Sequence, residues 1–274
     1  MALSPDRIEI LKKIDEYEKN GWFDRDVEDD PPTTPLDYNK VDYTQKKLSS
    51  RIKTKIANTV ARNYFDNLIK ENQLIIKEIR GIENFTSVNG GAIITCNHFN
   101  AYDNYAVYKT IQPYMGKKML YKIIREGNYT SFKGLYGYFF RNCNTLPLTS
   151  SIKGIGVFMK AVGELLLRGE KILIYPEQGM WWNYKKPRPL KDGAFMIAAK
   201  NNVPVVPFFI TMEDSCEIDK NNGSAVQAYT MHVLPPIYPD AAKSRRENTS
   251  AMMAENYAMW KKTYEDFYGI ELKY

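Results

Sequence analysis

A histidine and an aspartate five positions apart form the pair of side chains best suited to chemistry in this 274-residue chain. His98 and Asp103 lie within residues 97–103, which read NHFNAYD. An imidazole can take a proton from a hydroxyl as a general base, and a neighbouring carboxylate can hold its tautomer and balance the charge that forms. The second histidine of the chain, His232, stands in an apolar, strand-like run. We therefore treat His98 and Asp103 as the candidate catalytic pair.

The sequence around this pair predicts a strand before it and a helix after it. Residues 91–95 (GAIIT) are short, apolar and β-branched, which is typical of a buried strand. Residues 102–112 can form a helix. Open α/β folds commonly place their functional groups at the carboxyl ends of the strands. We therefore expect His98 and Asp103 at that edge of a sheet.

Strand-like and helix-like segments alternate from this point onward. Strands are predicted at residues 91–95, 118–124, 144–148, 171–175, 203–210 and 227–234. Helices are predicted at residues 102–112, 131–140, 152–168 and 191–200, with a closing helix at 249–268. Such alternation favours an α/β fold with a mostly parallel sheet flanked by helices. We assign this fold to residues 81–274 and expect a helical extension at the N-terminal side.

Two further motifs follow the histidine and aspartate in a fixed order. They are residues 174–179 (IYPEQG) and 203–207 (VPVVP). Together with residues 97–103 they resemble the glycerolipid acyltransferases, the superfamily of the 1-acylglycerol-3-phosphate O-acyltransferases. That family carries an N-H-x4-D motif, an (F/Y)-P-E-G-T-R-like block and a V-P-(V/I)-x-P block in this order. The resemblance runs from about residue 91 to residue 207.

The resemblance implies an enzyme of phospholipid biosynthesis and lipid metabolism. It would move a fatty acyl group from an acyl thioester to a hydroxyl of a lysophospholipid-like acceptor, with His98 as the general base oriented by Asp103. The donor would be acyl-CoA or an acylated carrier protein, acting as a co-substrate, and no cofactor or metal is expected. The resemblance also implies a substrate-binding role for Glu177 and Gly179, to which we add the neighbouring Asn97 and Gln178. Backbone N–H groups near Glu177 or after His98 are candidate donors to the developing oxyanion.

The chain departs from the family pattern where the family carries two arginines. Residues 177–180 read EQGM in place of EGTR, and an arginine precedes the strand-like segment 145–148 while none follows it. These arginines are thought to hold the acceptor's phosphate in the family, a task that suits a guanidinium. The candidate replacements are Lys122, Arg125, Arg141 and the basic run 185–188. We favour Arg125, because it would end the strand 118–124 near the edge that carries the catalytic pair.

Two other functions use the same residues differently. A hydrolase or thioesterase could use Cys143 or Cys96 as a nucleophile with His98 and Asp103, although nothing in the sequence marks either thiol as activated. A non-catalytic lipid or acyl-carrier binding protein could keep the fold alone. The three cysteines cannot all pair within one chain and show no metal-ligand spacing, which favours reduced thiols in a cytoplasmic protein.

The first 80 residues divide into an acidic and a basic segment. Residues 1–42 hold six basic against twelve acidic side chains, a balance of −6. A helix is predicted at residues 6–20, and the acidic, proline-rich run 24–35 predicts an extended arm over the body of the protein. Residues 43–80 hold nine basic against three acidic side chains, a balance of +6. Their pattern predicts a long helix over 43–79 with a break near Asn72.

This basic segment has two interpretations. An apolar residue recurs at every fourth position, at Leu48, Ile52, Ile56, Val60, Tyr64 and Leu68. The segment either packs on the catalytic domain with a solvated basic side, or it forms a helix pair that rests on an anionic bilayer. The resemblance favours the bilayer, because an N-terminal helix pair anchors some relatives to the membrane.

The composition bounds where the protein acts. No run of about 18 uncharged apolar residues is present, and charges interrupt the first ten residues where a signal peptide needs an apolar core. We therefore expect a cytoplasmic protein that binds peripherally to the inner face of the cell membrane, with no nucleic-acid partner. The aromatic pair at 181–182 can cover the core, or it can roof the acyl site or lie at the bilayer interface, and the sequence leaves these roles open.

Overall fold

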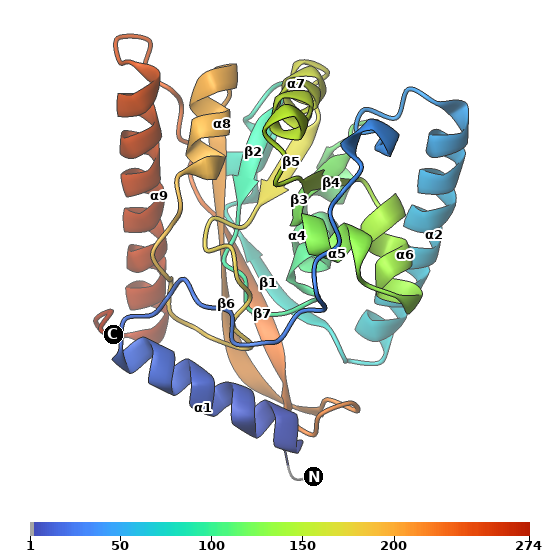
Figure 1. Ribbon diagram of the computed structural model, residues 1–274. Coiled ribbons are helices and arrows are strands. Elements are labelled where there is room, and N and C mark those ends of the chain that lie inside the picture. The colour runs from blue at the N-terminus through green and yellow to red at the C-terminus, as the bar shows by residue number, and fades with distance from the viewer. Residues whose placement is uncertain (1–2) are drawn as a thin grey trace.

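The computed structural model describes residues 3–274 and is built on one seven-stranded sheet (Figure 1). The strand order is β1-β7-β6-β2-β5-β3-β4. The strands are β1 (Ile75–Arg80), β2 (Ala92–Thr95), β3 (Leu120–Arg125), β4 (Thr145–Leu148), β5 (Lys171–Ile174), β6 (Val205–Ile218) and β7 (Ala225–Val233). Strands β2 to β6 run parallel, whereas β7 is antiparallel to β6 and pairs in parallel with β1. The predicted α/β fold with a mostly parallel sheet is confirmed.

Helices cover both faces of this sheet (Figure 1). They are α1 (Pro5–Lys19), α2 (Leu48–Lys70), α3 (Ile82–Thr86), α4 (Asp103–Ile111), α5 (Glu126–Thr130), α6 (Gly134–Asn142), α7 (Ile152–Leu167), α8 (Gly193–Asn201) and α9 (Arg245–Tyr268). Two short 3-10 turns, η1 (Tyr38–Lys40) and η2 (Gln112–Tyr114), complete the elements. Helices α2, α4 and α6 lie on one face, and α7, α8 and α9 on the other.

The central strand β2 shows why the catalytic motif has a fixed position. All four of its residues are buried, and alternate side chains point to opposite faces of the sheet. Ile94 packs into the core under α4, and Ile93 packs into the core under α7 and α8. With strands β5 and β6 hydrogen-bonded on its two sides, β2 cannot slip in register without moving both residues to the wrong core. His98 therefore follows a rigid strand at the carboxyl edge, as predicted.

The prediction of helical structure over residues 43–79 is wrong before Leu48 and beyond Lys70. Helix α2 ends there, Asn72 adopts a left-handed conformation with φ of 54°, and the chain continues into β1. The break near Asn72 was expected, but a strand follows it in place of a second helix. Residues 75–80 (IIKEIR) carry isoleucines four apart among lysine and glutamate, a pattern that also suits a helix. Pairing with β7 decides the outcome, so the sheet begins before residue 81.

Smaller differences concern the ends of helices. The helix predicted at 131–140 corresponds to α6, which begins three residues later, whereas the short helices α3 and α5 were not predicted. Helix α9 begins four residues earlier than expected, because Ser244 and Glu247 form a capping box that satisfies its first N–H groups. The predicted N-terminal helix and the extended acidic arm after it are both present.

Candidate active site

His98 and Asp103 come together as the sequence predicted. His98 Nδ1 lies 2.8 Å from Asp103 Oδ2, and Asp103 is the first residue of α4. The carboxyl group is completely buried, whereas the His98 side chain is 21% exposed. A carboxylate accepts hydrogen bonds, so we assign the proton to Nδ1. In this tautomer the second ring nitrogen, Nε2, is the basic one, and it makes no hydrogen bond within residues 3–274.

Three further donors fix the Asp103 carboxylate. The backbone N–H groups of Phe99 and Asn100 donate to Oδ2 at 3.1 and 3.2 Å. The hydroxyl of Tyr175 donates to Oδ1 at 2.6 Å, and its ring stacks on the His98 imidazole with centroids 3.9 Å apart. Burial first, and then the charge of Asp103, raises the pKa of Tyr175 well above its usual value. Tyr175 therefore remains a hydroxyl donor that holds both members of the pair.

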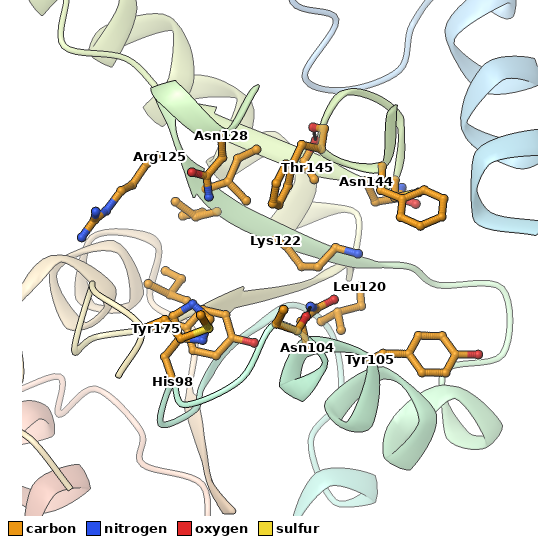
Figure 2. Close-up of a pocket in the computed structure, with 18 of the residues that line it drawn as sticks. His98, Asn104, Tyr105, Leu120, Lys122, Arg125, Asn128, Asn144, Thr145 and Tyr175 are labelled. Atoms are coloured by element: carbon orange, nitrogen blue, oxygen red, sulfur yellow. Dashed lines mark hydrogen bonds between the residues drawn. The ribbon is translucent and has the colours of Figure 1, made fainter. Parts of the chain in front are cut away.

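His98 lines a large cavity whose walls come from β3 and from helices α2, α4 and α6, with further lining residues from α7 and α8. Its volume is about 1680 Å³, more than a single small-molecule site usually needs. Tyr105 lines the part of the cavity far from His98 (Figure 2), and Phe65 packs between Tyr105 and Phe139. Figure 2 shows His98 and Tyr175 on one side of the cavity and Arg125 across from them on β3. The cavity thus has an apolar interior and a polar end that carries the catalytic pair.

Glu177 is buried next to the backbone of His98 and does not line the cavity. It is 5% exposed, and its carboxylate accepts hydrogen bonds from the backbone N–H groups of His98 (3.0 Å) and Arg188 (2.8 Å). The Arg188 guanidinium, 1% exposed, completes a buried ion pair at 3.3 Å and also donates to the carbonyl of Gly179. The acceptor-binding role that the resemblance implied for Glu177 therefore does not match its position. Glu177 joins the catalytic loop to the loop of Arg188.

The other residues of the two motifs have distinct surroundings. The Asn97 side chain bridges β2 to β6 through both backbone groups of Ile210, at 2.8 and 3.0 Å, and faces away from the cavity. Gln178 is exposed on the cavity wall in a left-handed conformation with φ of 66°. The N–H groups of Gln178 and Gly179 donate to carbonyls of their own turn at 3.0 Å. The oxyanion role expected of these N–H groups is therefore not supported by the structure.

Most of the candidate phosphate-binding residues already have partners within the protein. Arg141 donates to the carbonyls of Tyr129 and Phe132, which holds α5 against α6, and it does not line the cavity. In the run 185–188, Lys186 pairs with Glu18 and Arg188 with Glu177. Arg125 ends β3 at the catalytic edge as predicted, but acidic side chains of the N-terminal arm already pair with it.

Lys122 is the candidate that points into the middle of the cavity (Figure 2). Burial lowers the pKa of its ammonium group. Among the residues that the structure describes, no carboxylate pairs with it. Lys122 is therefore available to an anionic group of a substrate.

The cysteines and tryptophans are mostly buried. Burial raises the pKa of the Cys96 thiol well above its usual value and raises that of Cys143 as well, which disfavours either as a nucleophile. Trp181 is fully buried against Ile14 and Val27, whereas Trp182 lines the cavity, so the pair divides between the two expected roles. Within residues 3–274 no cluster of three acidic, histidine or cysteine side chains is placed to hold a metal ion.

Sequence reasoning missed two contributors to the site. Tyr175 lies inside the second motif, and its position just after a buried strand was the available signal. Asp26 belongs to the acidic arm, whose negative charge was noted without a partner. Only the fold brings Asp26 to Arg125, 99 residues away in sequence.

Comparisons with known proteins give a family match and a similar fold. Residues 77–211 match the sequence model of the acyltransferase family. The fold is similar to the crystal structure of the 1-acyl-sn-glycerophosphate (LPA) acyltransferase PlsC from Thermotoga maritima, with a TM-score of 0.53 and 16% identity, covering 98% of this chain and 97% of that chain. A comparison with curated protein sequences finds no match.

Fold and family match together define an acyltransferase with an α/β fold. Residues 77–211 carry the acyltransferase family match, which supports the resemblance to the glycerolipid acyltransferases that the three ordered motifs had indicated.

Proposed function

We propose that this protein transfers a fatty acyl group from an acyl thioester to a hydroxyl of a lysophospholipid-like acceptor, as 1-acylglycerol-3-phosphate O-acyltransferases do. The observation that carries the proposal is the buried Asp103 carboxylate 2.8 Å from His98 Nδ1, with His98 lining a cavity large enough for two substrates. The donor is acyl-CoA or an acylated carrier protein.

The chemistry follows from the tautomer. His98 Nε2 takes the proton of the acceptor hydroxyl as the oxygen attacks the thioester carbonyl. The imidazolium that forms is stabilised by the Asp103 carboxylate, which is already oriented by Phe99, Asn100 and Tyr175. The tetrahedral intermediate then collapses, the carbon–sulfur bond breaks, and the proton passes from His98 to the leaving thiolate. No serine or cysteine nucleophile is required, because the acyl group moves directly between two bound substrates.

An acylation assay tests this proposal. Purified protein is incubated with labelled acyl-CoA and a bacterial lipid extract, and the products are identified by mass spectrometry. We expect the label in an ester-linked lipid product, with free fatty acid only at background. Release of labelled fatty acid without a lipid product would favour the thioesterase alternative, and the absence of both would favour a binding protein.

We also propose that helix α2 rests on an anionic membrane surface. Its apolar residues Leu48, Ile52, Ile56 and Val60 are 40–69% exposed and therefore do not pack on the domain. At 100° per residue they lie opposite the buried residues Thr54, Ala57 and Phe65. No helix within residues 3–274 is long and apolar enough to cross a bilayer. Binding would thus be peripheral, by one helix, on the cytoplasmic face of the cell membrane.

Basic side chains flank this exposed row and give the membrane proposal its test. Replacing Arg51, Lys53 and Lys55 by glutamine should weaken co-sedimentation with phosphatidylglycerol vesicles by about 100-fold at low salt, since each basic residue near such a surface contributes about 1 kcal/mol. The difference should shrink in 0.5 M salt because the attraction is screened.

A matched control removes the same charge elsewhere. Lys261, Lys262 and Lys273 lie in α9 and after it, on the far side of the molecule, and their replacement should change vesicle binding little. Ile52→Asn with Ile56→Asn should weaken binding at every salt concentration. Failure of the wild-type protein to sediment with anionic vesicles at any ionic strength would rule out the membrane role.

A further inference from the structure

The acidic arm, residues 24–35, crosses the polar end of the cavity and meets Arg125 there. Asp26 accepts two parallel hydrogen bonds from the guanidinium, from Nη1 at 2.6 Å and from Nη2 at 2.8 Å. Asp30 lies 3.6 Å from Nη1. A guanidinium binds a carboxylate or a phosphate with this same two-pronged geometry. Asp26 therefore occupies the place that an anionic substrate group would take.

This ion pair lies at the catalytic edge of the sheet. Arg125 is the last residue of β3, which is separated from the His98 strand β2 only by β5. A Cβ atom on Gly179 would come within 2.6 Å of the Asp26 carboxylate and 3.6 Å of the Arg125 guanidinium. The ion pair thus covers the turn that follows Glu177, across the cavity from His98 (Figure 2).

Contacts on both sides of Asp26 hold the arm in place. Val27 is fully buried beside Trp181, whose indole N–H donates to the carbonyl of Arg25 at 2.9 Å. Glu28 pairs with Arg7 of α1 at 2.6 Å. Because the arm is ordered by these contacts, Asp26 meets Arg125 at little additional entropic cost. A free anion must compete with a carboxylate that is already positioned.

The local charge also opposes an anionic substrate. Three carboxylates of the arm, those of Asp26, Glu28 and Asp30, face the two guanidinium groups of Arg7 and Arg125, which leaves a formal charge of −1. Burial, together with Asp26 and Glu28, raises the pKa of Asp30 against the opposing effect of Arg125. A phosphate monoester arriving here would meet like charge, which is a common source of discrimination between ligands.

We propose that Asp26 is a specificity-determining residue that fills the anion-binding position at Arg125. The preferred acceptor is then a lysolipid that presents no phosphate monoester there, with a polar part that is uncharged or carries an ammonium group. This inference rests on the proposed acyl transfer and names its acceptor class.

Two acceptors that differ only in the phosphate test the proposal. The wild-type protein should show a higher kcat/KM with 1-monoacylglycerol than with 1-acylglycerol 3-phosphate. Asp26→Ala should shift the ratio of the two values at least about tenfold towards the phosphate acceptor, the size of one lost charge-assisted contact. The shift should vanish in the double variant Asp26→Ala/Arg125→Ala. Asp29→Ala, in the same arm with a side chain 97% exposed, should leave the ratio unchanged.

A binding measurement separates this inference from the proposed reaction. Calorimetric titration with glycerol 3-phosphate requires no acyl transfer, and Asp26→Ala should bind it at least about tenfold more tightly than wild type, but only with Arg125 present. This result combined with no transfer to any acceptor would support the inference and contradict the proposed function. Equal binding by wild type and variant, equal changes for both acceptors, or a wild-type preference for the phosphate acceptor would overturn the inference. If the wild type prefers the phosphate acceptor, Lys122 is the next candidate for the residue that binds the phosphate.

Discussion

His98→Ala is expected to lower turnover by about 10²–10⁴-fold while the protein stays folded. Asp103 orients the His98 imidazole, which is the proposed general base. The His98 side chain is only partly buried, so its truncation should leave the core intact. Initial rates of acyl transfer with purified protein, free of host acyltransferase, measure the effect. Turnover close to wild type in this variant would refute the general-base mechanism.

Asp103→Asn tests the second member of the pair. Asparagine has nearly the same shape but no charge, so it cannot balance the imidazolium that forms during proton transfer. Turnover should fall strongly in Asp103→Asn, whereas the midpoint of unfolding should change little. Tyr175→Phe removes only the hydroxyl that donates to Asp103 at 2.6 Å and should cost less. His232→Gln is the matched control, because this histidine lies on β7 beside Thr211, outside the cavity, and should leave turnover within about twofold.

Arg188→Met is expected to destabilise the protein by about 3–5 kcal/mol, because it leaves the buried Glu177 carboxylate without a counter-charge. Burial lowers the pKa of Arg188, and the nearby Glu177 carboxylate opposes that shift. Urea denaturation followed by tryptophan fluorescence measures the free energy of unfolding. The exposed Arg246 provides a control, since Arg246→Met should change stability by no more than about 0.5 kcal/mol.

A double variant separates charge pairing from packing at this position. Glu177→Gln with Arg188→Met should cost less than the two single changes added together, because each removes the partner that the other leaves unpaired. Additive costs, or an Arg188→Met protein as stable as wild type, would show that the ion pair contributes little. Activity should fall in Arg188→Met, since Glu177 also accepts a hydrogen bond from the His98 backbone.

The sequence by itself determined the candidate catalytic pair and the parallel architecture. His98 and Asp103 are five residues apart, so a strand end and a helix start bring them together without help from distant segments. Strands β2 to β5 and the buried first part of β6 could be predicted because each is a short, mostly apolar run, whereas the extension of β6 to Ile218, which carries polar and exposed residues, was not predicted. The helices α7 and α8 could be predicted from apolar residues at helical spacing. In each case the information lies within about 20 consecutive residues.

The tertiary structure alone decided which distant residues meet. Residues 75–80 suit a helix and a strand about equally, and hydrogen bonds to β7, some 150 residues later, select the strand. Distant segments also decide which charged side chains pair with one another. Arg125 pairs with Asp26, and Arg188 with Glu177, because the fold places them within hydrogen-bonding distance, and no local pattern distinguishes them from other arginines. Local propensity therefore specified the candidate pair His98 and Asp103, whereas long-range packing specified the charged side chains around the cavity.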